Sequence, residues 1–444
     1  MPVVGIQTVN VSFIESMKDE KTMTIKFITT ADTHLDSPMR GLERYEGAPV
    51  EEIRGATRKA FVNLVEFAIS EQVAFVIIAG DLYDGDLKDY QTALFLAHQM
   101  QRLNKAGINV FIASGNHDAA SIITKKLKMP ENVRFFSTRK PETFLLDDLR
   151  IAIHGQGYAS QAVDDNLAAN YPGAVDGYFN IGVLHTALTG REGHELYAPC
   201  NIDDLKFKQY DFWSLGHVHT REVISEDPWI IFPGNLQGRN IRETGAKGAT
   251  LVTIEDMVVE SVQHHDFDTI RWDHVEVDVS ETRHGHEVVN MVKNSLETKI
   301  DPDNDRIFAL RLTITGRTEA HAELVLNQEL YRNQIRAVSF EIGENIWLEK
   351  IRFKTRTVID LDSLMEHDDP IAGLLNYIQT MRVAGTIDEK MLQDEFGDLR
   401  NKLPPEYKKM EDVLDFDNPK TLVGLLDEVE QFLIPKLFER EHLS

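Results

Sequence analysis

The chain is poor in cysteine and has no long apolar run, and both absences narrow the classes of protein it can be. Its 444 residues include one cysteine, Cys200, which excludes an internal disulfide framework and a zinc cluster built from thiolates. No stretch of about 18 apolar residues is present, so we expect no membrane span. Residues 1–22 lack the basic start and apolar block of a secretory signal. These features favour a cytoplasmic protein with a short extension over 1–22.

Positive charge is also scarce. The formal net charge of -25 argues against a surface that binds nucleic acid over its whole area, although a local basic track would be sufficient. The candidate tracks are Lys125 to Lys128, Arg134 to Lys140, and Arg239 with Arg242 and Lys247. An ordinary solvated face is the alternative for each of them.

The first part of the chain alternates apolar runs with helical patterns. Runs that end at Ala31, Ala79 and Ala113 are typical of strands covered on both faces. Between them, 51–71 and 92–106 carry apolar residues at helical spacing. This order predicts a parallel sheet with right-handed crossovers.

Short strands dominate from about residue 133, and this change predicts a second, mostly antiparallel half. Two packed sheets with helices outside would make an α/β/β/α sandwich. Beyond about residue 268, strand and helix patterns predict a small α+β unit, followed by an acidic helical region. The segments we expect are 1–22 as an extension, 23–267 as the core, 268–360 as a second domain and 361–444 as a helical C-terminal region.

Polar side chains follow five of the predicted strands, at the point where each strand ends. They are Asp32, His34, Asp81, Asn116, His185, His217 and His219, with His117 beside them. Ligands of open α/β sheets gather at the carboxyl ends of strands, and residues i and i+2 of an extended segment point to the same side. Oxygen and imidazole ligands without thiolates suit Mn, Fe, Zn or Ni.

Seven candidate ligands are too many for one tetrahedral ion and suit two ions that share a ligand. Asp81 is the natural bridge, because a carboxylate has two oxygens to give. Two ions about 3.5–4 Å apart can clamp the oxygens of a phosphate and prepare water for in-line attack. The neutral imidazoles leave such a site cationic, which predicts an anionic substrate. His117 is placed to act as general acid, and Asp118 to orient an imidazole or cap the following helix.

These motifs resemble those of the calcineurin-like metallophosphoesterases. Asp-x-His, Gly-Asp, Gly-Asn-His-Asp, a lone His and Gly-His-x-His occur in that order between residues 32 and 219. The stretches 31–38 and 233–239 look like the DNA-repair exonuclease branch, which includes SbcD-like proteins and, most similar of all, the YhaO-type proteins. The resemblance implies a two-sheet metallophosphoesterase sandwich with a capping domain over 268–360 that helps to grip DNA.

The resemblance also implies roles for individual residues. It gives the first metal ion Asp32, His34, Asp81 and His219. It gives the second Asp81, Asn116, His185 and His217. His117 would be the catalytic acid and manganese the usual activator. Arg239 is a candidate contact for a substrate phosphate, and Asp84 either lines the cleft or caps a loop.

Other histidines offer alternatives. His194 lies nine residues after His185 and is the alternative for its role. His154 is interpreted as a satisfied surface histidine, because glycines beside it indicate a turn. His264 and His265 are expected to be exposed after the last core strand.

The C-terminal part carries two patterns relevant to partners. Lys350, Arg352, Lys354 and Arg356 alternate with less polar residues, which predicts either a DNA track along one strand face or a solvated face. Apolar stripes at 371–378 and 422–433 either pack on their own domain or dock to a partner. The family resemblance implies a homodimer and a coiled-coil ATPase partner of the SMC-like, ABC type (SbcC or YhaN). The chain has no Gly-x-x-x-x-Gly-Lys loop, so an ATP-driven step needs a second protein.

Three functions compete on this sequence. The leading hypothesis is a metal-dependent DNA phosphodiesterase in DNA repair or processing, exonucleolytic on duplex ends and in addition endonucleolytic on single strands. The alternative is a hydrolase of small phosphoesters or cyclic nucleotides, which the same metal site would serve. A non-catalytic scaffold is the third, and the complete ligand set with His117 argues against it.

Overall fold

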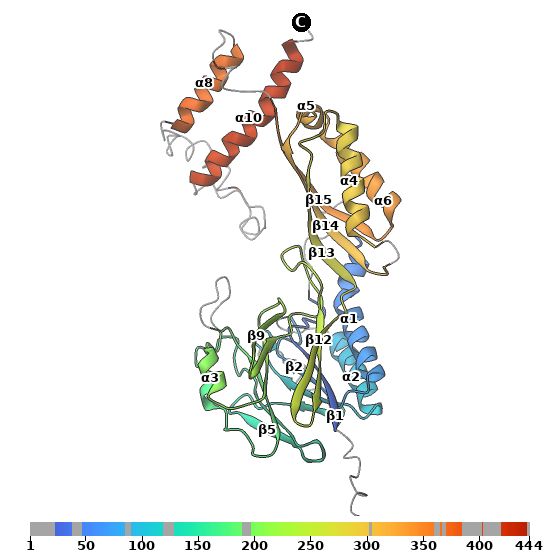
Figure 1. The fold of residues 1–444 in the computed structure, drawn as a ribbon, viewed down its shortest axis with the longest axis vertical. Coiled ribbons are helices and arrows are strands. Elements are labelled where there is room, and N and C mark those ends of the chain that lie inside the picture. Colours follow the sequence, from blue (N-terminus) through green and yellow to red (C-terminus); the bar gives the residue numbers. More distant parts are fainter. Residues whose placement is uncertain are drawn as a thin grey trace, which may run out of the picture. The chain divides into compact units, whose positions relative to one another are not determined.

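The computed structural model describes residues 23–37, 47–84, 90–118, 128–188, 197–301, 304–358, 365, 370–383, 402 and 419–441. The predicted extension 1–22, residues 125–127 of the first basic track and His194 lie outside this set. The described residues form two compact units: the first reaches Trp272 and the second starts at Asp273, with 47–48 grouped with the second. Each unit is described by itself (Figure 1). No helix in these ranges is long and apolar enough to cross a membrane.

Two six-stranded sheets form the first unit. The first sheet has the order β12-β11-β1-β2-β3-β4 and the second β5-β6-β7-β8-β10-β9. The strands of the first sheet are β1 (Thr24–Thr30), β2 (Phe75–Ala79), β3 (Asn109–Ala113), β4 (Val133–Phe135), β11 (Gly248–Glu255) and β12 (Val258–Asp266). Those of the second are β5 (Glu142–Leu146), β6 (Ile151–Gln156), β7 (Phe179–His185), β8 (Phe212–Gly216), β9 (Glu222–Glu226) and β10 (Trp229–Phe232).

The second sheet is not mostly antiparallel, so that part of the sequence prediction was wrong. Strands β6, β7, β8 and β10 run parallel, and only the outer strands β5 and β9 pair antiparallel. Parallel neighbours need crossover connections, which usually contain a long helix. In the described parts of the connections between β6, β7 and β8, which leave out 189–196, the helices are the short η4 (Leu167–Asn170) and α3 (Ile202–Lys206). The sequence therefore lacked the helical periodicity that marks a parallel sheet.

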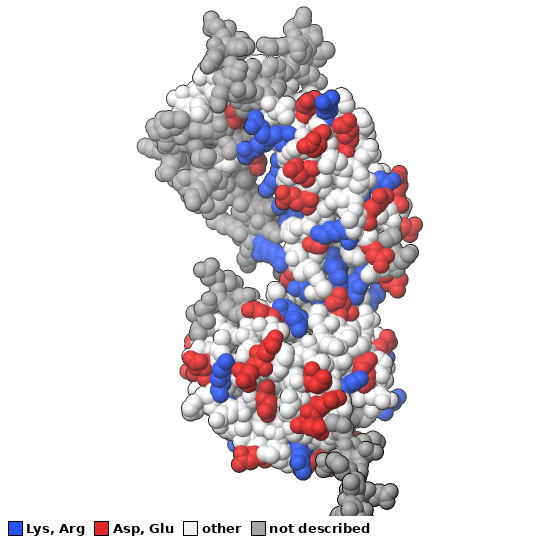
Figure 2. All heavy atoms as spheres, viewed as in Figure 1, with Lys and Arg blue, Asp and Glu red and all other residues white. Residues whose placement is uncertain are grey.

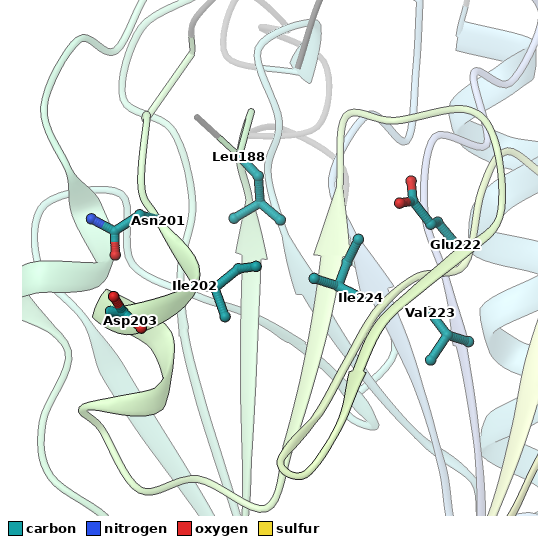
Figure 3. A pocket seen from close by; sticks show the side chains of 7 residues that line it. All are labelled: Leu188, Asn201, Ile202, Asp203, Glu222, Val223 and Ile224. Atoms are coloured by element: carbon teal, nitrogen blue, oxygen red, sulfur yellow. The ribbon is translucent and has the colours of Figure 1, made fainter. Parts of the chain in front are cut away.

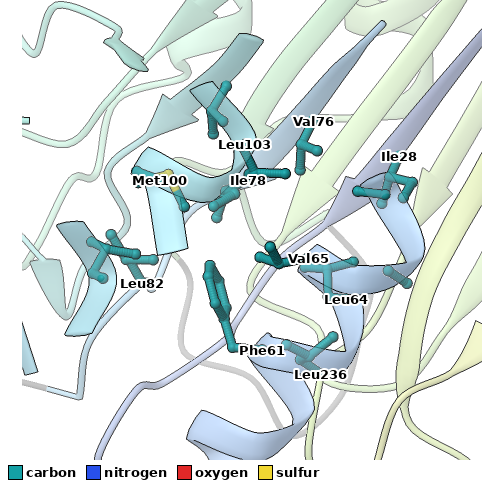
Figure 4. Close-up of a cluster of buried hydrophobic side chains, with 14 of the residues drawn as sticks. Ile28, Phe61, Leu64, Val65, Val76, Ile78, Leu82, Met100, Leu103 and Leu236 are labelled. Atoms are coloured by element: carbon teal, nitrogen blue, oxygen red, sulfur yellow. The ribbon is translucent and has the colours of Figure 1, made fainter. Parts of the chain in front are cut away.

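Helices α1 (Val50–Ser70) and α2 (Tyr90–Lys105) pack against the first sheet. In β2, Val76 and Ile78 join the cluster under these helices, with Phe61 and Leu64 of α1 (Figure 4). The alternate residues of the same strand face the second sheet. A strand buried on both faces reads as a continuous apolar run. On its outer face the second sheet packs against η4 and α3, which completes the α/β/β/α sandwich predicted from the sequence.

Three histidines of the first unit lie elsewhere than expected. His154 is buried in β6, with Nδ1 2.8 Å from Thr143 Oγ1 and Nε2 3.1 Å from the side-chain oxygen Oδ1 of Asn180. The prediction of a surface position was wrong because β6 continues to Gln156 instead of turning. His264 and His265 are half-buried within β12, which runs to Asp266, so the expected exposure was also wrong.

The second unit contains a three-stranded sheet in the order β13-β14-β15. Its elements are β13 (Ile270–Asp278), α4 (Gly285–Lys299), β14 (Ile307–Arg317), α5 (His321–Leu326), α6 (Gln328–Ile342) and β15 (Ile346–Arg356). Helices α4 and α6 contribute to one apolar cluster with alternate residues of all three strands. The sequence predicted this strand and helix order.

The C-terminal helices α8 (Pro370–Val383) and α10 (Pro419–Glu441) contact each other in the second unit. Ile371 and Leu375 pack against Ile434, so the first apolar stripe is buried within its own unit. In the second stripe Val429 and Phe432 are exposed, at 44% and 46%. Helix α10 also contacts α5, where His321 Nε2 lies 3.1 Å from the Gln431 carbonyl oxygen.

Candidate dimetal site

The loops after β1, β2, β3, β7 and β8 bring the candidate ligands together, although these strands belong to two different sheets. One group consists of Asp32, His34 and His219, whose ligand atoms all lie within 4.8 Å of one another. The Nε2 atoms of His34 and His219 are 3.2 Å apart. His34 and His219 are 185 residues apart in the sequence, and the sandwich places them side by side.

A second group shares Asp32 with the first. The ligand atoms of Asp32, Asp81 and His185 also lie within 4.8 Å of one another. His185 Nε2 is 2.9 Å from the Asn116 side-chain oxygen and 3.4 Å from Asp81 Oδ2. The same Asp81 oxygen lies 4.0 Å from His34 Nε2. Its carboxylate therefore faces imidazoles of both groups, while Asp32 is the residue that belongs to both; the bridging role of Asp81 stays a prediction.

His217 lies beside this second group. Its backbone N–H donates to both carboxylate oxygens of Asp32, each at 3.1 Å. Its ring contacts those of His185 and Tyr197 edge-on, with centroid distances of 5.3 and 5.6 Å. The structure thus brings all seven predicted ligands into one neighbourhood.

Four of these residues have backbone angles in the left-handed region. The φ angles are 48° at Asp32, 40° at His34, 49° at Asp81 and 98° at His217. Non-glycine residues adopt this region only when the surrounding structure enforces it, and such residues cluster at functional sites. Here Asp32 N–H donates to the Gly80 carbonyl and His34 N–H to the Asp81 carbonyl, both at 3.0 Å. Backbone hydrogen bonds between the two loops hold the side chains in place.

Two glycines of the motifs are required by close approach. A Cβ atom on Gly115 would collide with the Asp81 carboxylate, and one on Gly216 would collide with the Ala79 carbonyl. The glycines of Gly-Asn-His-Asp and Gly-His-x-His therefore allow neighbouring strand ends to meet at the site.

Burial sets the charge of the site. Burial, with the nearby Asp81 charge, raises the pKa of Asp32 well above its ordinary value. Burial also raises the pKa of Asp81, to about 6, although His117 opposes the shift. Burial lowers the pKa of His34, and it lowers that of His185 to about 3. The imidazoles of His34 and His185 are therefore neutral and offer lone pairs, while the crowded carboxylates favour a cation between them. This donor set fits two divalent ions.

Asp118 connects two loops rather than orienting an imidazole. Its carboxylate accepts backbone N–H groups from Leu82 at 3.1 Å, Tyr83 at 3.0 Å and Gly115 at 3.0 Å. Burial and the Asp81 charge raise its pKa to about 7. The residues after Asp118 that would form the helix to be capped lie outside the described ranges. Asp118 thus fixes the loop that carries Asp81 against the loop that carries Asn116.

Asp84 belongs to the site. Its Oδ1 lies 3.3 Å from His117 Nδ1, and its Oδ2 accepts a hydrogen bond from Ser37 Oγ at 2.5 Å. The sequence left its role open, because a carboxylate three residues after Asp81 serves equally well in a turn.

Arg239 is held by carboxylates. Its guanidinium lies 2.8 Å from Glu243 Oε1 and 3.6 Å from Asp84 Oδ2. The phosphate contact proposed for Arg239 stays a prediction. The sequence did not predict a role for Glu243. It lies in a loop, where no periodic pattern distinguishes a buried acid from a solvated one. Burial alone would raise the pKa of Glu243, but hydrogen bonds from His219 and the charge of Arg239 hold it well below its ordinary value.

A pocket of about 540 Å³ lies beside β9 in the same unit (Figure 3). Its lining consists of Leu188, Asn201, Ile202, Asp203, Glu222, Val223 and Ile224. None of these is a predicted ligand, and the carboxylates of Asp203 and Glu222 would repel an anionic substrate. The pocket is therefore not the site that the strand ends form.

Comparisons with known proteins agree with this geometry. A model of the calcineurin-like phosphoesterase family matches residues 25–268, and one of the middle domain of the metallophosphoesterase YhaO matches 272–356. The chain is 38% identical over 277 residues to the uncharacterized metallophosphoesterase YhaO of Bacillus subtilis, covering 61% of this chain and 67% of that protein. It is 28% identical over 237 residues to the DNA double-strand break repair protein Mre11 of Sulfurisphaera tokodaii, covering 50% and 58%.

Among solved structures, the chain is similar to the protein TT1561 of Thermus thermophilus, with a TM-score of 0.33 and 13% identity, covering 55% of this chain and 100% of that one. The match to the Mre11 protein spans little more than half the length of that relative.

Proposed function

Since the chain belongs to the calcineurin-like phosphoesterase family, we propose that it is a two-metal phosphodiesterase that cleaves DNA. It is a metal-dependent phosphoesterase, a hydrolase acting on ester bonds, by its family and by its buried aspartate and histidine groups. The observation that carries the proposal is the convergence of those groups next to His117 and Asp84. DNA as the substrate and manganese as the metal are our inferences.

The residues divide the chemical work. Asp32, His34, Asp81 and His219 would hold one divalent ion, and Asp81, Asn116, His185 and His217 the other. Bound there, the ions would supply positive charge to the phosphate oxygens and lower the pKa of a water molecule. Neutral imidazoles and an asparagine leave that charge uncompensated, which selects an anionic ester. The backbone hydrogen bonds around Asp32 and His34 keep the groups in position.

His117 is the general acid in this proposal. Its side chain is 40% exposed, so it faces the space that a substrate would enter. Asp84 lies on the Nδ1 side of the ring at 3.3 Å, which favours a proton on Nδ1 and turns Nε2 toward the substrate. A protonated Nε2 can then donate to the departing oxygen of the ester. The edge-on contact with the His34 ring, at a centroid distance of 5.2 Å, places this proton beside the metal ligands.

Two observations support DNA. Ile351 and Phe353 of β15 belong to the apolar cluster with α4 and α6, so the alternating Lys350, Arg352, Lys354 and Arg356 lie on the opposite face of the sheet. In Figure 2, blue spheres lie along the left edge of the unit that contains this sheet, and others lie among red spheres at its lower end and right side. A strand with such a face can follow a phosphate backbone. The second observation is the similarity to a protein named for DNA double-strand break repair.

The expected partners follow from the same proposal. We propose cleavage from duplex ends, with endonuclease activity on single strands, by a homodimer that works with a coiled-coil ATPase of the SMC-like, ABC type. The exposed Val429 and Phe432 on α10 are apolar side chains that such a partner could cover.

The net charge of -25 favours a second candidate, a hydrolase of small phosphoesters or cyclic nucleotides, because long-range repulsion opposes a polyanion more than a small ester. A substrate panel separates the two. It contains a linear duplex, a closed single-stranded circle, bis-p-nitrophenyl phosphate and a cyclic mononucleotide, each with manganese. Turnover of DNA supports the proposal, and turnover of the small esters alone would replace it by the second candidate.

A further inference from the structure

Glu243 occupies a central position next to the metal site. It follows β10 in a loop, and its side chain is only 11% exposed. Its Oε1 lies 2.8 Å from both His219 Nδ1 and Arg239 Nη2. Its Oε2 accepts the Asn235 side-chain amide at 2.9 Å and the Arg239 backbone N–H at 2.8 Å. Arg239 Nε also donates, at 3.2 Å from Oε1. Five donor groups from three residues therefore converge on one buried carboxylate.

This arrangement determines which nitrogen of His219 carries the proton. His219 Nδ1 lies closer to Glu243 Oε1, at 2.8 Å, than to Arg239 Nη2, at 3.3 Å. A carboxylate surrounded by N–H donors acts as an acceptor only, so the shorter contact requires a proton on Nδ1. In the neutral imidazole, Nε2 then keeps its lone pair. That atom lies 3.2 Å from His34 Nε2, on the side of the ring where Asp32 and His34 converge. Glu243 therefore turns the unprotonated nitrogen toward the place where a cation fits.

His185 has the same arrangement, but the acceptor at its Nδ1 is a backbone carbonyl. Its Nδ1 lies 3.1 Å from the Ala79 carbonyl, and its Nε2 faces Asn116 and Asp81. A carbonyl of β2 cannot be removed by substitution, whereas the equivalent acceptor for His219 is a side chain. A substitution of Glu243 can therefore measure how much an acceptor at Nδ1 contributes to metal binding by the histidine.

Glu243 also reaches the other side of the site. Arg239, held by Glu243 along one edge, places Nη1 3.6 Å from Asp84 Oδ2. Asp84 in turn lies 3.3 Å from His117 Nδ1. The chain of contacts from His219 through Glu243, Arg239 and Asp84 to His117 connects a predicted metal ligand with the predicted general acid.

We propose that Glu243 is the positioning residue that fixes His219 for metal binding through Nε2 and holds Arg239 against Asp84. The inference rests on the proposed function only in taking His219 as a ligand of a divalent ion. Carboxylates that accept from the second nitrogen of a ligating histidine fix its orientation, and their loss typically costs about 10- to 100-fold in metal affinity.

Manganese binding to the full-length chain tests this inference without any substrate. We would compare wild type with Glu243→Gln by isothermal titration and by counting bound manganese. Glu260→Gln is the matched control, because Glu260 is an exposed acid of β12 in the same unit. We expect Glu243→Gln to weaken one of two manganese sites by about 10- to 100-fold while the other site and the control keep wild-type affinity. Two sites of wild-type affinity in Glu243→Gln would overturn the inference.

A second variant covers the case in which Glu243→Gln fails to fold. Glu243→Asp keeps the charge but withdraws the carboxylate by one methylene from His219, so one manganese site should again weaken. A folded Glu243→Asp protein that holds both ions as tightly as wild type would contradict the inference. If wild type holds two manganese ions but cleaves no DNA, the DNA proposal fails, and the affinities of the variants still decide the role of Glu243.

Discussion

His117 Nδ1 lies 3.3 Å from Asp84 Oδ1, and this contact joins the loop after β3 to the loop after β2. Ser37 Oγ and the Arg239 guanidinium approach the other oxygen of Asp84, at 2.5 and 3.6 Å. The carboxylate is therefore fixed from three directions, and the imidazole of His117 is fixed with it. An oriented imidazole beside a cluster of metal ligands is the arrangement that general acid catalysis of ester cleavage requires.

Replacing Asp84 by Asn should impair turnover more than binding. The variant loses the charge that favours a proton on His117 Nδ1, so we expect kcat for bis-p-nitrophenyl phosphate to fall by about 10- to 100-fold, part of the ~10²- to 10⁴-fold that general acid catalysis supplies. KM and manganese content should stay close to wild type. Steady-state kinetics together with metal analysis check this. An increase in KM with an unchanged kcat would show that Asp84 acts on substrate binding instead.

Asp81→Ala should remove both metal ions. Its carboxylate faces imidazoles of both ligand groups, at 3.4 Å from His185 and 4.0 Å from His34, and we expect Asp32, the residue that the two groups share, not to hold the ions without it. Elemental analysis after gel filtration in manganese measures the stoichiometry. Asp148→Ala, at an exposed position in the same unit, is the control and should keep two ions. An Asp81→Ala protein that still holds two ions would rule out the bridging role.

The buried His154 should make the protein less stable in mild acid. Burial lowers its pKa below the ordinary value of 6.5, so the unfolded chain binds a proton more readily than the folded one. The stability contributed by the neutral form is fully present above pH 6.5 and is lost as the pH falls below that value.

In His154→Gln this loss should be smaller. Between pH 7.5 and 5.5 we expect Tm to fall by about 2–4 °C less than in wild type, the shift that ~1 kcal/mol produces in a domain of this size. Thermal unfolding of metal-free protein measures it. His98→Gln, at an exposed position on α2, should behave as wild type, and an equal fall in all three proteins would refute the role of His154.

Lys354→Glu should weaken DNA binding but not the hydrolysis of a small ester. Lys354 is exposed on the face of β15 opposite to α4 and α6. Loss of one phosphate contact should reduce the slope of log K against log salt by about 1. Fluorescence anisotropy over a salt series measures this slope. Lys293→Glu on α4 is the control of equal charge change. Equal slopes in wild type and Lys354→Glu would remove this face from the DNA track.

The candidate ligands could be predicted from the sequence because each one follows an apolar run. Asp32, Asp81 and His185 stand directly after residues that can only be buried strands, and the carboxyl ends of strands are where ligands gather. The layers of the first unit, and the order of strands and helices along the chain in the second, followed from the same periodicity.

Other features could not be predicted, because they depend on contacts between distant segments. The carboxylates of Glu243 and Asp84 lie in loops, where no periodicity distinguishes a buried acid from a solvated one. The role of Asp118 as an acceptor for three backbone groups depends on two loops meeting. The burial of His154 follows from the length of β6. The parallel centre of the second sheet has crossovers whose described parts contain short helices, η4 and α3.

The most direct test of the central claim is manganese-dependent cleavage of an end-labelled linear duplex by wild type and by His117→Ala. We predict cleavage by wild type that is abolished by chelation, and a loss of about 10²- to 10⁴-fold in His117→Ala with two manganese ions retained. If wild type loaded with two manganese ions leaves the duplex intact, or if His117→Ala cleaves it at the wild-type rate, the assignment of a two-metal DNA phosphodiesterase with His117 as its acid is wrong.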